Sequence, residues 1–211
     1  MKMTNQRNRL VYRHWAPIYD ATVNRIFMPG RRRALDVLAL QPGERVLIVG
    51  VGTGEDLLLL RDGVEAVGID ISPEMLAKAR SKIGRCLARV RLIEGDAQVP
   101  RVEEGPFDAA ILNLILTVIP DGKACLHSTF QMLKPGARAV VFDKFLPEGH
   151  NPSPVRKVMN VFSTMLGTDI NRRLDDMMRD CPCKVLLDEP SIAGGLYRVV
   201  LLCKDERAGS P

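Results

Sequence analysis

The sequence predicts an α/β fold built around a mostly parallel sheet. Short apolar runs that suit buried strands alternate with segments that suit helices, an order typical of βαβ units. A glycine-rich loop follows the first run, and Gly194-Gly195 separates the last two runs, which predicts an antiparallel hairpin. The chain has 211 residues, enough for one domain with a sizeable core.

Five apolar runs predict the parallel strands, and two further runs predict the closing hairpin. In chain order they are residues 45–49, 64–69, 90–97, 107–116 and 137–145, followed by two runs within 185–204. The run 107–116 is continuously apolar, as expected of a strand that is buried on both faces of a sheet.

The helices between these strands are indicated by signals at their ends. Residues 54–61 carry Glu55 and Asp56 near their start, and acidic side chains favour a helix N-terminus. Ser72 and Pro73 predict the N-cap and the first position of a second helix. Residues 123–137 suit a third helix that ends at the turn Lys134-Pro135-Gly136.

We expect three parts along the chain. Residues 1–33 predict an amphipathic helical segment that acts as a lid, because aromatic and apolar side chains alternate there with arginines. Residues 34–204 form the α/β domain, and residues 205–211 form a disordered tail. The helical insertion 146–180 is either a second lid over the carboxyl edge of the sheet or a crossover helix that packs on the core.

The positive charge is concentrated at the N-terminus. The net charge is +5 overall, but residues 1–33 hold eight basic residues and one acidic residue, a net charge of +7. Such asymmetry indicates an anionic partner, which is a membrane surface, a nucleic acid or an acidic substrate. The alternative is a basic helix face that is simply solvated. The cluster Arg31-Arg32-Arg33 contacts lipid phosphate in the first case and solvent in the second.

Other composition features exclude several classes of protein. No apolar run approaches the roughly 18 residues that span a membrane, and the first ten residues lack the apolar core of a secretory signal. The five cysteines fit no zinc pattern and are expected to be free thiols. The histidines form no ligand cluster, and His127 is expected to be structural. We therefore expect a cytoplasmic protein with no metal site.

The glycine loop predicts the type of ligand. Gly50, Gly52 and Gly54 follow a strand, and Asp70 ends the next strand, 20 positions after Gly50. Glycines let the backbone approach a ligand, and a carboxylate at this place accepts hydrogen bonds from two ribose hydroxyls. A dinucleotide prefers the longer spacing G-x-G-x-x-G, so S-adenosylmethionine, a smaller ligand, is favoured over a dinucleotide. A dinucleotide-dependent oxidoreductase is therefore the less favoured class of protein.

Five segments together are similar to one family. VLIVGVGTG, GIDISPEML, EGDAQVP, FDAAILNLILTVIPD and LKPGARAVVFDKF resemble, in order and spacing, the class I S-adenosylmethionine-dependent methyltransferases. The resemblance covers about residues 45–145 and the terminal hairpin. It implies a Rossmann-like sheet of seven strands, mostly parallel with an antiparallel last strand, and S-adenosylmethionine as cofactor.

The resemblance also implies roles for individual residues. Gly50, Gly52 and Gly54 would pass over the methionine part, Asp70 would hold the ribose, and Ile71 and Met75 would pack on the adenine. Asp96 would meet the adenine amino group with the backbone of Ala97 nearby, and Asn113 and Leu114 would face the methionine part and the sulfonium. Independently of the resemblance, an N-terminal segment that packs as a lid would turn Tyr12 and Tyr19 toward the cofactor.

One position departs from the family pattern. Members of the family usually carry Asp or Glu where this chain has Ile48, and an isoleucine cannot accept a hydrogen bond. Either Asp56 or Asn113 compensates for the loss, or the cofactor binds weakly, or the protein binds S-adenosylmethionine without catalysis. Because the other four segments are intact, we favour an enzyme.

The methyl acceptor is indicated less directly. The fourth strand ends in Asn113-Leu114-Ile115-Leu116 and lacks the proline-containing tetrapeptide of DNA adenine and glutamine methyltransferases. YRHWAPIYD resembles the start of bacterial phosphatidylethanolamine N-methyltransferases and, less closely, of quinone-ring C-methyltransferases. FDKFLPEGHNPSP also resembles the former group. This implies methylation of phosphatidylethanolamine toward phosphatidylcholine at the inner face of a membrane. A quinone precursor, a small metabolite and RNA are the alternatives, and RNA is disfavoured because no RNA-binding module is recognisable.

The amine of such an acceptor must lose a proton before it attacks the methyl group. Tyr12, Tyr19 and Asp143 are the candidates to orient the amine or accept this proton. Asp143 follows the fifth strand at the expected ligand edge, and its alternative role is to pair with Lys144 or a loop amide.

Overall fold

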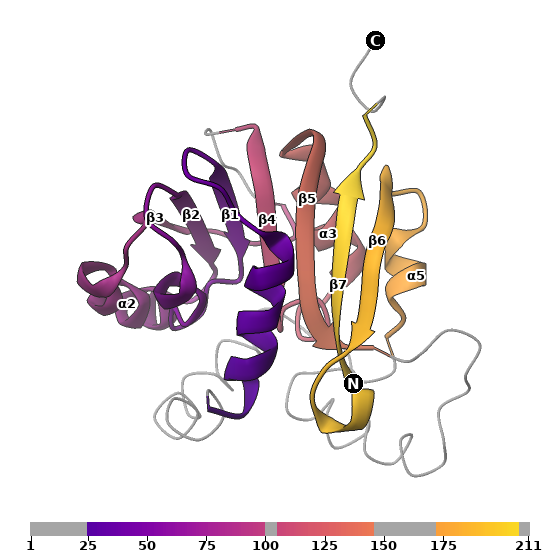
Figure 1. Cartoon of the computed structure of the whole chain (residues 1–211), viewed down its shortest axis with the longest axis horizontal. Coiled ribbons are helices and arrows are strands. Elements are labelled where there is room, and N and C mark those ends of the chain that lie inside the picture. Colours follow the sequence, from indigo (N-terminus) through magenta and orange to yellow (C-terminus); the bar gives the residue numbers. More distant parts are fainter. Residues whose placement is uncertain (1–24, 100–104, 146–171, 207–211) are drawn as a thin grey trace.

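The computed structural model describes residues 25–99, 105–145 and 172–206, and in this part of the chain seven strands form one sheet (Figure 1). They are β1 (Arg45–Val49), β2 (Glu65–Asp70), β3 (Arg89–Glu94), β4 (Phe107–Asn113), β5 (Leu133–Lys144), β6 (Cys183–Pro190) and β7 (Tyr197–Lys204). Their order is β3-β2-β1-β4-β5-β7-β6. β1 to β5 pair in parallel, and β7 is antiparallel to both β5 and β6. The predicted α/β class and terminal hairpin are confirmed.

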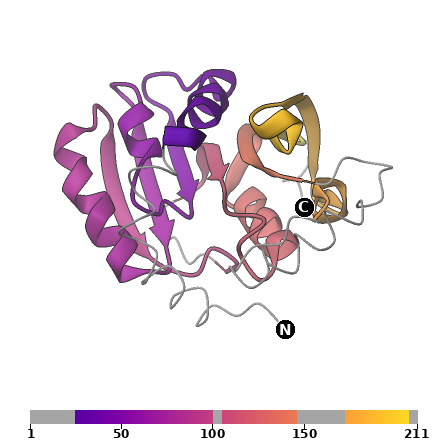
Figure 2. The ribbon, with the colours of Figure 1, turned by 90° about the horizontal axis from the view of Figure 1, so that it is seen from below.

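Helices cover both faces of this sheet. The labelled helices are α2 (Pro73–Lys82), α3 (Gly122–Gln131) and α5 (Leu174–Met178), with short 3₁₀ turns η1 (Asp56–Leu59), η2 (Ile83–Arg85) and η3 (Ala193–Gly195). Residues 25–38 are also helical. This helix and α3 lie on opposite sides of the sheet (Figure 2), each over its own cluster of buried side chains. The result is a three-layer arrangement.

The strands form where buried apolar residues alternate between these two clusters. In β1, Val46 and Ile48 belong to the cluster that includes helix 25–38, whereas Leu47 and Val49 belong to the cluster beneath α3. This alternation follows from the two-residue period of a strand. Burial on both faces explains why β1 and β4 read as continuous apolar runs.

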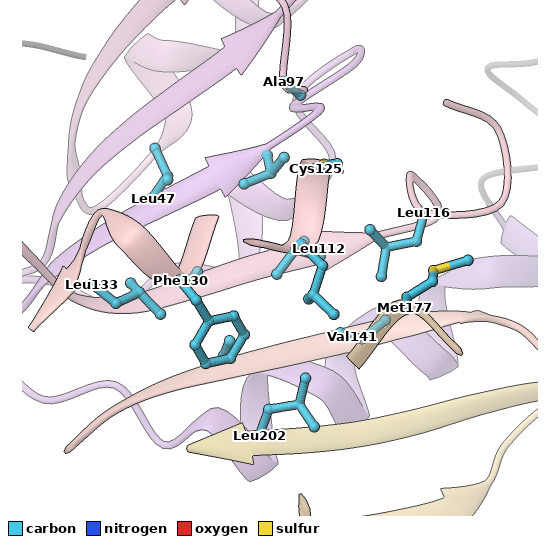
Figure 3. Packing of buried hydrophobic residues seen from close by; sticks show 14 of the residues in the cluster. Leu47, Ala97, Leu112, Leu116, Cys125, Phe130, Leu133, Val141, Met177 and Leu202 are labelled. Carbon is cyan, nitrogen blue, oxygen red and sulfur yellow. The ribbon is translucent and has the colours of Figure 1, made fainter. Parts of the chain in front are cut away.

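The cluster beneath α3 joins strands that are far apart in the sequence. Leu112, Val141 and Leu202 come from three neighbouring strands and surround Phe130 of α3 (Figure 3). Met177 of α5 belongs to the same cluster, so α5 is fixed to the core although it belongs to the predicted insertion 146–180. Only residues 172–180 of that insertion are described, and its other residues lie outside the described part of the chain.

Helix 25–38 packs on the sheet through a row of buried residues that begins with a glycine. Gly30, Ala34 and Leu38 recur at four-residue spacing and are buried. A Cβ atom on Gly30 would lie 2.2 Å from Cζ of Phe142, so only glycine permits this approach. At the C-terminal end of the helix, the guanidinium of Arg138 donates to the carbonyl oxygen of Leu38 at 2.8 Å. This carbonyl oxygen has no partner within the helix, so Arg138 supplies its hydrogen bond. The helix runs without a break across residue 33, where we expected a boundary.

Two sequence predictions of local structure are wrong. The helix expected over 54–61 is only the four-residue turn η1, because Leu60 returns to an extended conformation. The turn Lys134-Pro135-Gly136 does not end a helix. It lies inside β5, where Gly136 takes a positive φ of 73° and the register with β4 shifts.

The helix starts are better predicted. Ser72 caps α2 by accepting a hydrogen bond from the backbone N–H of Met75 at 3.3 Å, and Pro73 is the first helical residue, as expected. Asp121, which we did not predict as a cap, caps α3 in the same way through the N–H of Ala124 at 2.9 Å. His127 contacts the carbonyl oxygen of Met177 at 3.2 Å, which agrees with its expected structural role.

The contact between Gly30 and Phe142 generates a stability prediction. We expect Gly30→Ala to lower the free energy of unfolding by about 1–3 kcal/mol, because the new methyl group must push the helix away from the ring. Urea denaturation would measure this loss. Gly84→Ala is the matched control, since a Cβ there meets no atom within 4 Å. Equal stability of the two variants would contradict the close contact.

Candidate functional site

Three strand ends meet at one edge of the sheet. β1 lies between β2 and β4, at the point where the strand order reverses direction. Ligands of open α/β sheets bind at such a switch point, beyond the carboxyl ends of the strands. Gly50, Asp70 and Asn113 stand at the carboxyl ends of β1, β2 and β4. The candidate site is therefore built from three segments that the sequence separates by 20 and 43 positions.

The glycine loop is shaped by left-handed backbone conformations. Gly50, Gly52 and Gly54 have φ values of 70°, 54° and 82°. A Cβ atom on Gly50 would lie 2.6 Å from Ile115, and one on Gly54 would lie 3.0 Å from Cα of Ala79 in α2. In contrast, a Cβ on Gly52 would meet only the carbonyl oxygen of Gly50, at 3.9 Å. Two glycines thus permit close packing, and the third presents an open backbone surface.

Asp70 fixes this loop. Its carboxylate accepts hydrogen bonds from the backbone N–H of Gly52 at 2.8 Å and of Ser72 at 2.9 Å. Burial raises the pKa of Asp70, and the backbone hydrogen bonds from Ser72, Gly52 and Ile71 oppose that rise. Each carboxylate oxygen has a second lone pair, so the side chain can still accept from ribose hydroxyls.

The residues expected around the adenine lie on neighbouring loops. Ile71 follows Asp70, and Met75 is buried in the first turn of α2. Asp96 lies two residues beyond β3 and accepts from the N–H of Gln98 at 2.9 Å, while Ala97 is buried beside it. The backbone links the two loops, because the N–H of Gly95 donates to the carbonyl oxygen of Asp70 at 3.0 Å. Their contacts with adenine remain predictions.

The end of β4 holds a buried amide. Asn113 is 4 % exposed, and its Nδ2 donates to Oδ1 of Asp56 at 2.9 Å. Its Oδ1 is buried and has no hydrogen-bond partner among the described residues. An acceptor of this kind costs about 1–3 kcal/mol when it is left without a donor. Leu114 follows with a φ of 60°, a strained conformation for a branched residue, held by its N–H to the carbonyl oxygen of Phe142.

Ile48 itself is 1 % exposed and lies in the apolar cluster beneath helix 25–38. Asp56 is 2 % exposed and accepts from Nη1 of Arg31 at 2.6 Å as well as from Asn113. The two residues that could compensate for Ile48 are thus in direct contact. Arg31 completes the group and was missed as a site residue, because the sequence places it in a basic cluster with no visible partner.

Two arginines of the cluster Arg31-Arg32-Arg33 form ion pairs within the chain. Arg31 pairs with Asp56, and Arg33 donates to both carboxylate oxygens of Glu189 at 2.6 and 3.0 Å. The contact with Glu189 raises the pKa of Arg33 and lowers that of Glu189. Arg32 is exposed. Two of the three side chains are thus occupied by carboxylates of the same chain.

Asp143 is not placed as a base that an acceptor could reach. It is 0 % exposed, and its oxygens accept from the N–H of Thr117 at 3.0 Å, the hydroxyl of Thr117 at 2.7 Å and the N–H of Lys144 at 2.8 Å. Burial raises the pKa of Asp143, which these hydrogen bonds and the charge of Lys144 oppose. These contacts agree with the alternative role, in which Asp143 anchors the loop after β4.

Two other expectations cannot be placed. Tyr12 and Tyr19, with the predicted lid, lie outside the described residues. Within the described ranges, no group of three or more His, Cys, Asp or Glu side chains is arranged to hold a metal ion, and the five cysteines are free thiols. No helix in these ranges is both long enough and apolar enough to cross a membrane.

Comparisons with known proteins identify the class that has this fold and site. Residues 46–136 match a family model described as a methyltransferase domain. A phosphatidylethanolamine N-methyltransferase of Cereibacter sphaeroides is 31 % identical over 189 residues, which cover 88 % of this chain and 92 % of that protein. The chain belongs to the S-adenosylmethionine-dependent methyltransferases, and it is an enzyme that uses this cofactor.

Two further similarities extend the comparison. A demethylmenaquinone methyltransferase of Thermus thermophilus is 35 % identical over 136 residues, which cover 61 % of each chain. The crystal structure of a SAM-dependent methyltransferase from Methanosarcina mazei has a TM-score of 0.60 at 20 % identity, covering 79 % of this chain and 94 % of that chain. At that identity the likeness shows the fold alone.

The described residues fit S-adenosylmethionine on structural grounds. Gly52 leaves a backbone surface open above the loop, and Oδ1 of Asn113 is a buried acceptor that lacks a donor. Asp70 would hold the ribose and the glycine loop would hold the methionine part.

The carboxylate of Asp70 generates the first prediction for this site. We expect Asp70→Ala to weaken S-adenosylhomocysteine binding by roughly 100-fold, because two loop N–H groups lose a charged acceptor that contributes about 1.5–3 kcal/mol per bond. Isothermal titration calorimetry would measure it, with the exposed Asp36→Ala as control. Binding by the wild type should also fall on acidification at a higher pH than for an ordinary aspartate, because burial raises the pKa of Asp70. Unchanged affinity in Asp70→Ala would contradict the assigned role.

Asp143 provides a second prediction. We expect Asp143→Asn to lower the free energy of unfolding by about 1–3 kcal/mol, since an amide cannot satisfy all three donors. The pH profile of kcat should keep its shape in the folded variant, because a buried anchor does not exchange protons with the acceptor. Loss of the acidic limb, the fall of kcat at low pH, at normal stability would instead make Asp143 the base.

Proposed function

We propose that this enzyme methylates the amine of phosphatidylethanolamine, toward phosphatidylcholine, at the surface of an anionic membrane. One observation carries the proposal. The similarity to the phosphatidylethanolamine N-methyltransferase extends over 189 residues, well beyond the residues 46–136 of the methyltransferase domain. The quinone relative matches over 136 residues. The longer match therefore includes segments that lie outside the methyltransferase domain, and we expect these segments to recognise the acceptor.

The proposed reaction needs little covalent chemistry from the protein. S-adenosylmethionine supplies a methyl group bound to a sulfonium, and a neutral amine attacks it in line. The chain would contribute alignment, with the glycine loop and Asn113 at the methionine part of the cofactor and Asp70 at its ribose. Tyr12 and Tyr19 remain the candidates to orient the amine, on the basis of the sequence alone.

The charge distribution supports contact with an anionic surface. Because Arg31 and Arg33 pair within the chain, six of the eight basic residues in 1–33 remain for contact with lipid. They are Lys2, Arg7, Arg9, Arg13, Arg25 and Arg32. Each basic side chain near an anionic membrane contributes about 1 kcal/mol of binding free energy. Several such residues together would hold the enzyme reversibly, without a membrane-spanning helix.

A second candidate is C-methylation of a quinone precursor. It is favoured by the higher identity to the demethylmenaquinone methyltransferase, 35 % over the matched residues. The nucleophile would then be a ring carbon next to an ionised hydroxyl, rather than an amine. Both candidates use the same cofactor site, so only the labelled product separates them.

The experiment uses the full chain and S-adenosylmethionine with a labelled methyl group. We expect label in mono- and dimethylated lipid when vesicles contain phosphatidylethanolamine and an anionic lipid. Transfer should fall when salt is raised, because ionic strength screens the basic segment, whereas transfer to short-chain phosphatidylethanolamine in neutral micelles should change little. Label in demethylmenaquinone and none in lipid would support the second candidate and overturn the first.

A further inference from the structure

The polar group Arg31, Asp56 and Asn113 links the helix before the sheet to the end of β4. Asp56 lies between the other two, with Arg31 Nη1 at 2.6 Å from its Oδ2 and Asn113 Nδ2 at 2.9 Å from its Oδ1. Asp56 and Asn113 are 2 % and 4 % exposed. Side chains of this polarity are rarely buried unless their hydrogen bonds are satisfied.

The chemistry of a carboxylate determines how the amide is oriented. An ionised carboxylate only accepts hydrogen bonds, so the amide nitrogen of Asn113 must face Asp56. The amide oxygen then points away from Asp56, and it has no donor among the described residues. The other carboxylate oxygen of Asp56 accepts from Arg31, so both of its oxygens face donors. The protein thus holds a buried acceptor in a fixed direction and leaves it without a donor of its own.

The position of this acceptor indicates what donates to it. Asn113 ends β4 on one side of β1, whereas Asp70 ends β2 on the other side, where the ribose is expected. The glycine loop between them would cover the methionine part of the cofactor. That part carries one donor, the α-ammonium group, because its carboxylate can only accept. The orphaned oxygen therefore suits the ammonium.

We propose that Arg31 and Asp56 are positioning residues that hold Oδ1 of Asn113 toward the α-ammonium of S-adenosylmethionine. Arg31 and Asp56 thereby compensate for the acidic side chain that members of the family usually carry at the position of Ile48. The inference concerns the cofactor and holds for either methyl acceptor. It makes cofactor affinity depend on Arg31, a residue on a helix that precedes the whole sheet.

The test compares two ligands that differ in this tail. S-adenosylhomocysteine has the α-ammonium, and 5′-methylthioadenosine lacks the amino acid part. We expect Asp56→Asn and Arg31→Gln to weaken S-adenosylhomocysteine binding by at least about tenfold, because the amide of Asn113 is then free to turn. Binding of 5′-methylthioadenosine should change by less than about twofold. Calorimetry on the folded full chain measures both affinities.

The chain offers a matched control on the same helix. Arg33→Gln makes the same change of charge and breaks an exposed ion pair with Glu189. We expect it to leave both affinities within about twofold of the wild type. An effect of Arg33→Gln as large as that of Arg31→Gln would mean that any loosening of the helix disturbs the site, and would overturn the proposal.

A further variant keeps the test decisive if Asp56→Asn does not fold. Asn113→Ala removes the acceptor directly, and we expect the same selective loss for S-adenosylhomocysteine. In a background of Asn113→Ala, changing Arg31 to Gln should add little further selectivity, since the residues act through one oxygen. Equal losses for the two ligands, or no loss for either, would show that the group is only structural.

Discussion

The site depends on the parallel pairing of β1 with β2 on one side and β4 on the other. Val49 is in register with Ile69, and Ile48 is in register with Ile111, so all three strands end at the same edge. The pairing continues past the strands, because the N–H of Val51 donates to the carbonyl oxygen of Ile69 at 2.9 Å. A slip of one residue would turn every side chain of a strand to the opposite face. The apolar pattern that buries both faces of β1 therefore also sets where the loop meets Asp70.

The helix over residues 25–38 is the second constraint, because it packs on one face of the sheet and contacts the carboxyl edge through Arg31. Its contacts are polar near the middle of the helix, where Arg31 pairs with Asp56, and apolar toward its C-terminal end, at Ala34 and Leu38. A buried ion pair is often no more stable than apolar side chains of similar volume, while removal of one partner costs about 3–5 kcal/mol. Stability alone thus does not explain why Arg31 and Asp56 are buried together. The orientation that they impose on the amide of Asn113 does give the pair a function.

The sequence predicts what short-range patterns determine and fails where distant partners decide. The strands were recognisable because burial on both faces demands continuous apolar runs, and the start of α2 because Ser72 and Pro73 act locally. Residues 54–61 were misread as a helix, although their consecutive leucines have no helical spacing. The roles of Arg33 and Asp143 depend on partners 156 and 26 positions away in the sequence, so no local pattern reveals them. The loop glycines and Asp70 were predicted by spacing, whereas Arg31 was counted only as surface charge.

The isoleucine at position 48 and the ion pair of Asp56 are two aspects of one arrangement. Ile48 lies in the apolar cluster that helix 25–38 covers, where an unpaired carboxylate would be costly. Asp56 is equally buried, but Arg31 reaches it from that helix. Gly30, the residue before Arg31, sets how closely the helix approaches Phe142. A larger residue there would move the guanidinium away together with the helix, so the packing of the helix and the electrostatics of the cofactor site cannot vary independently.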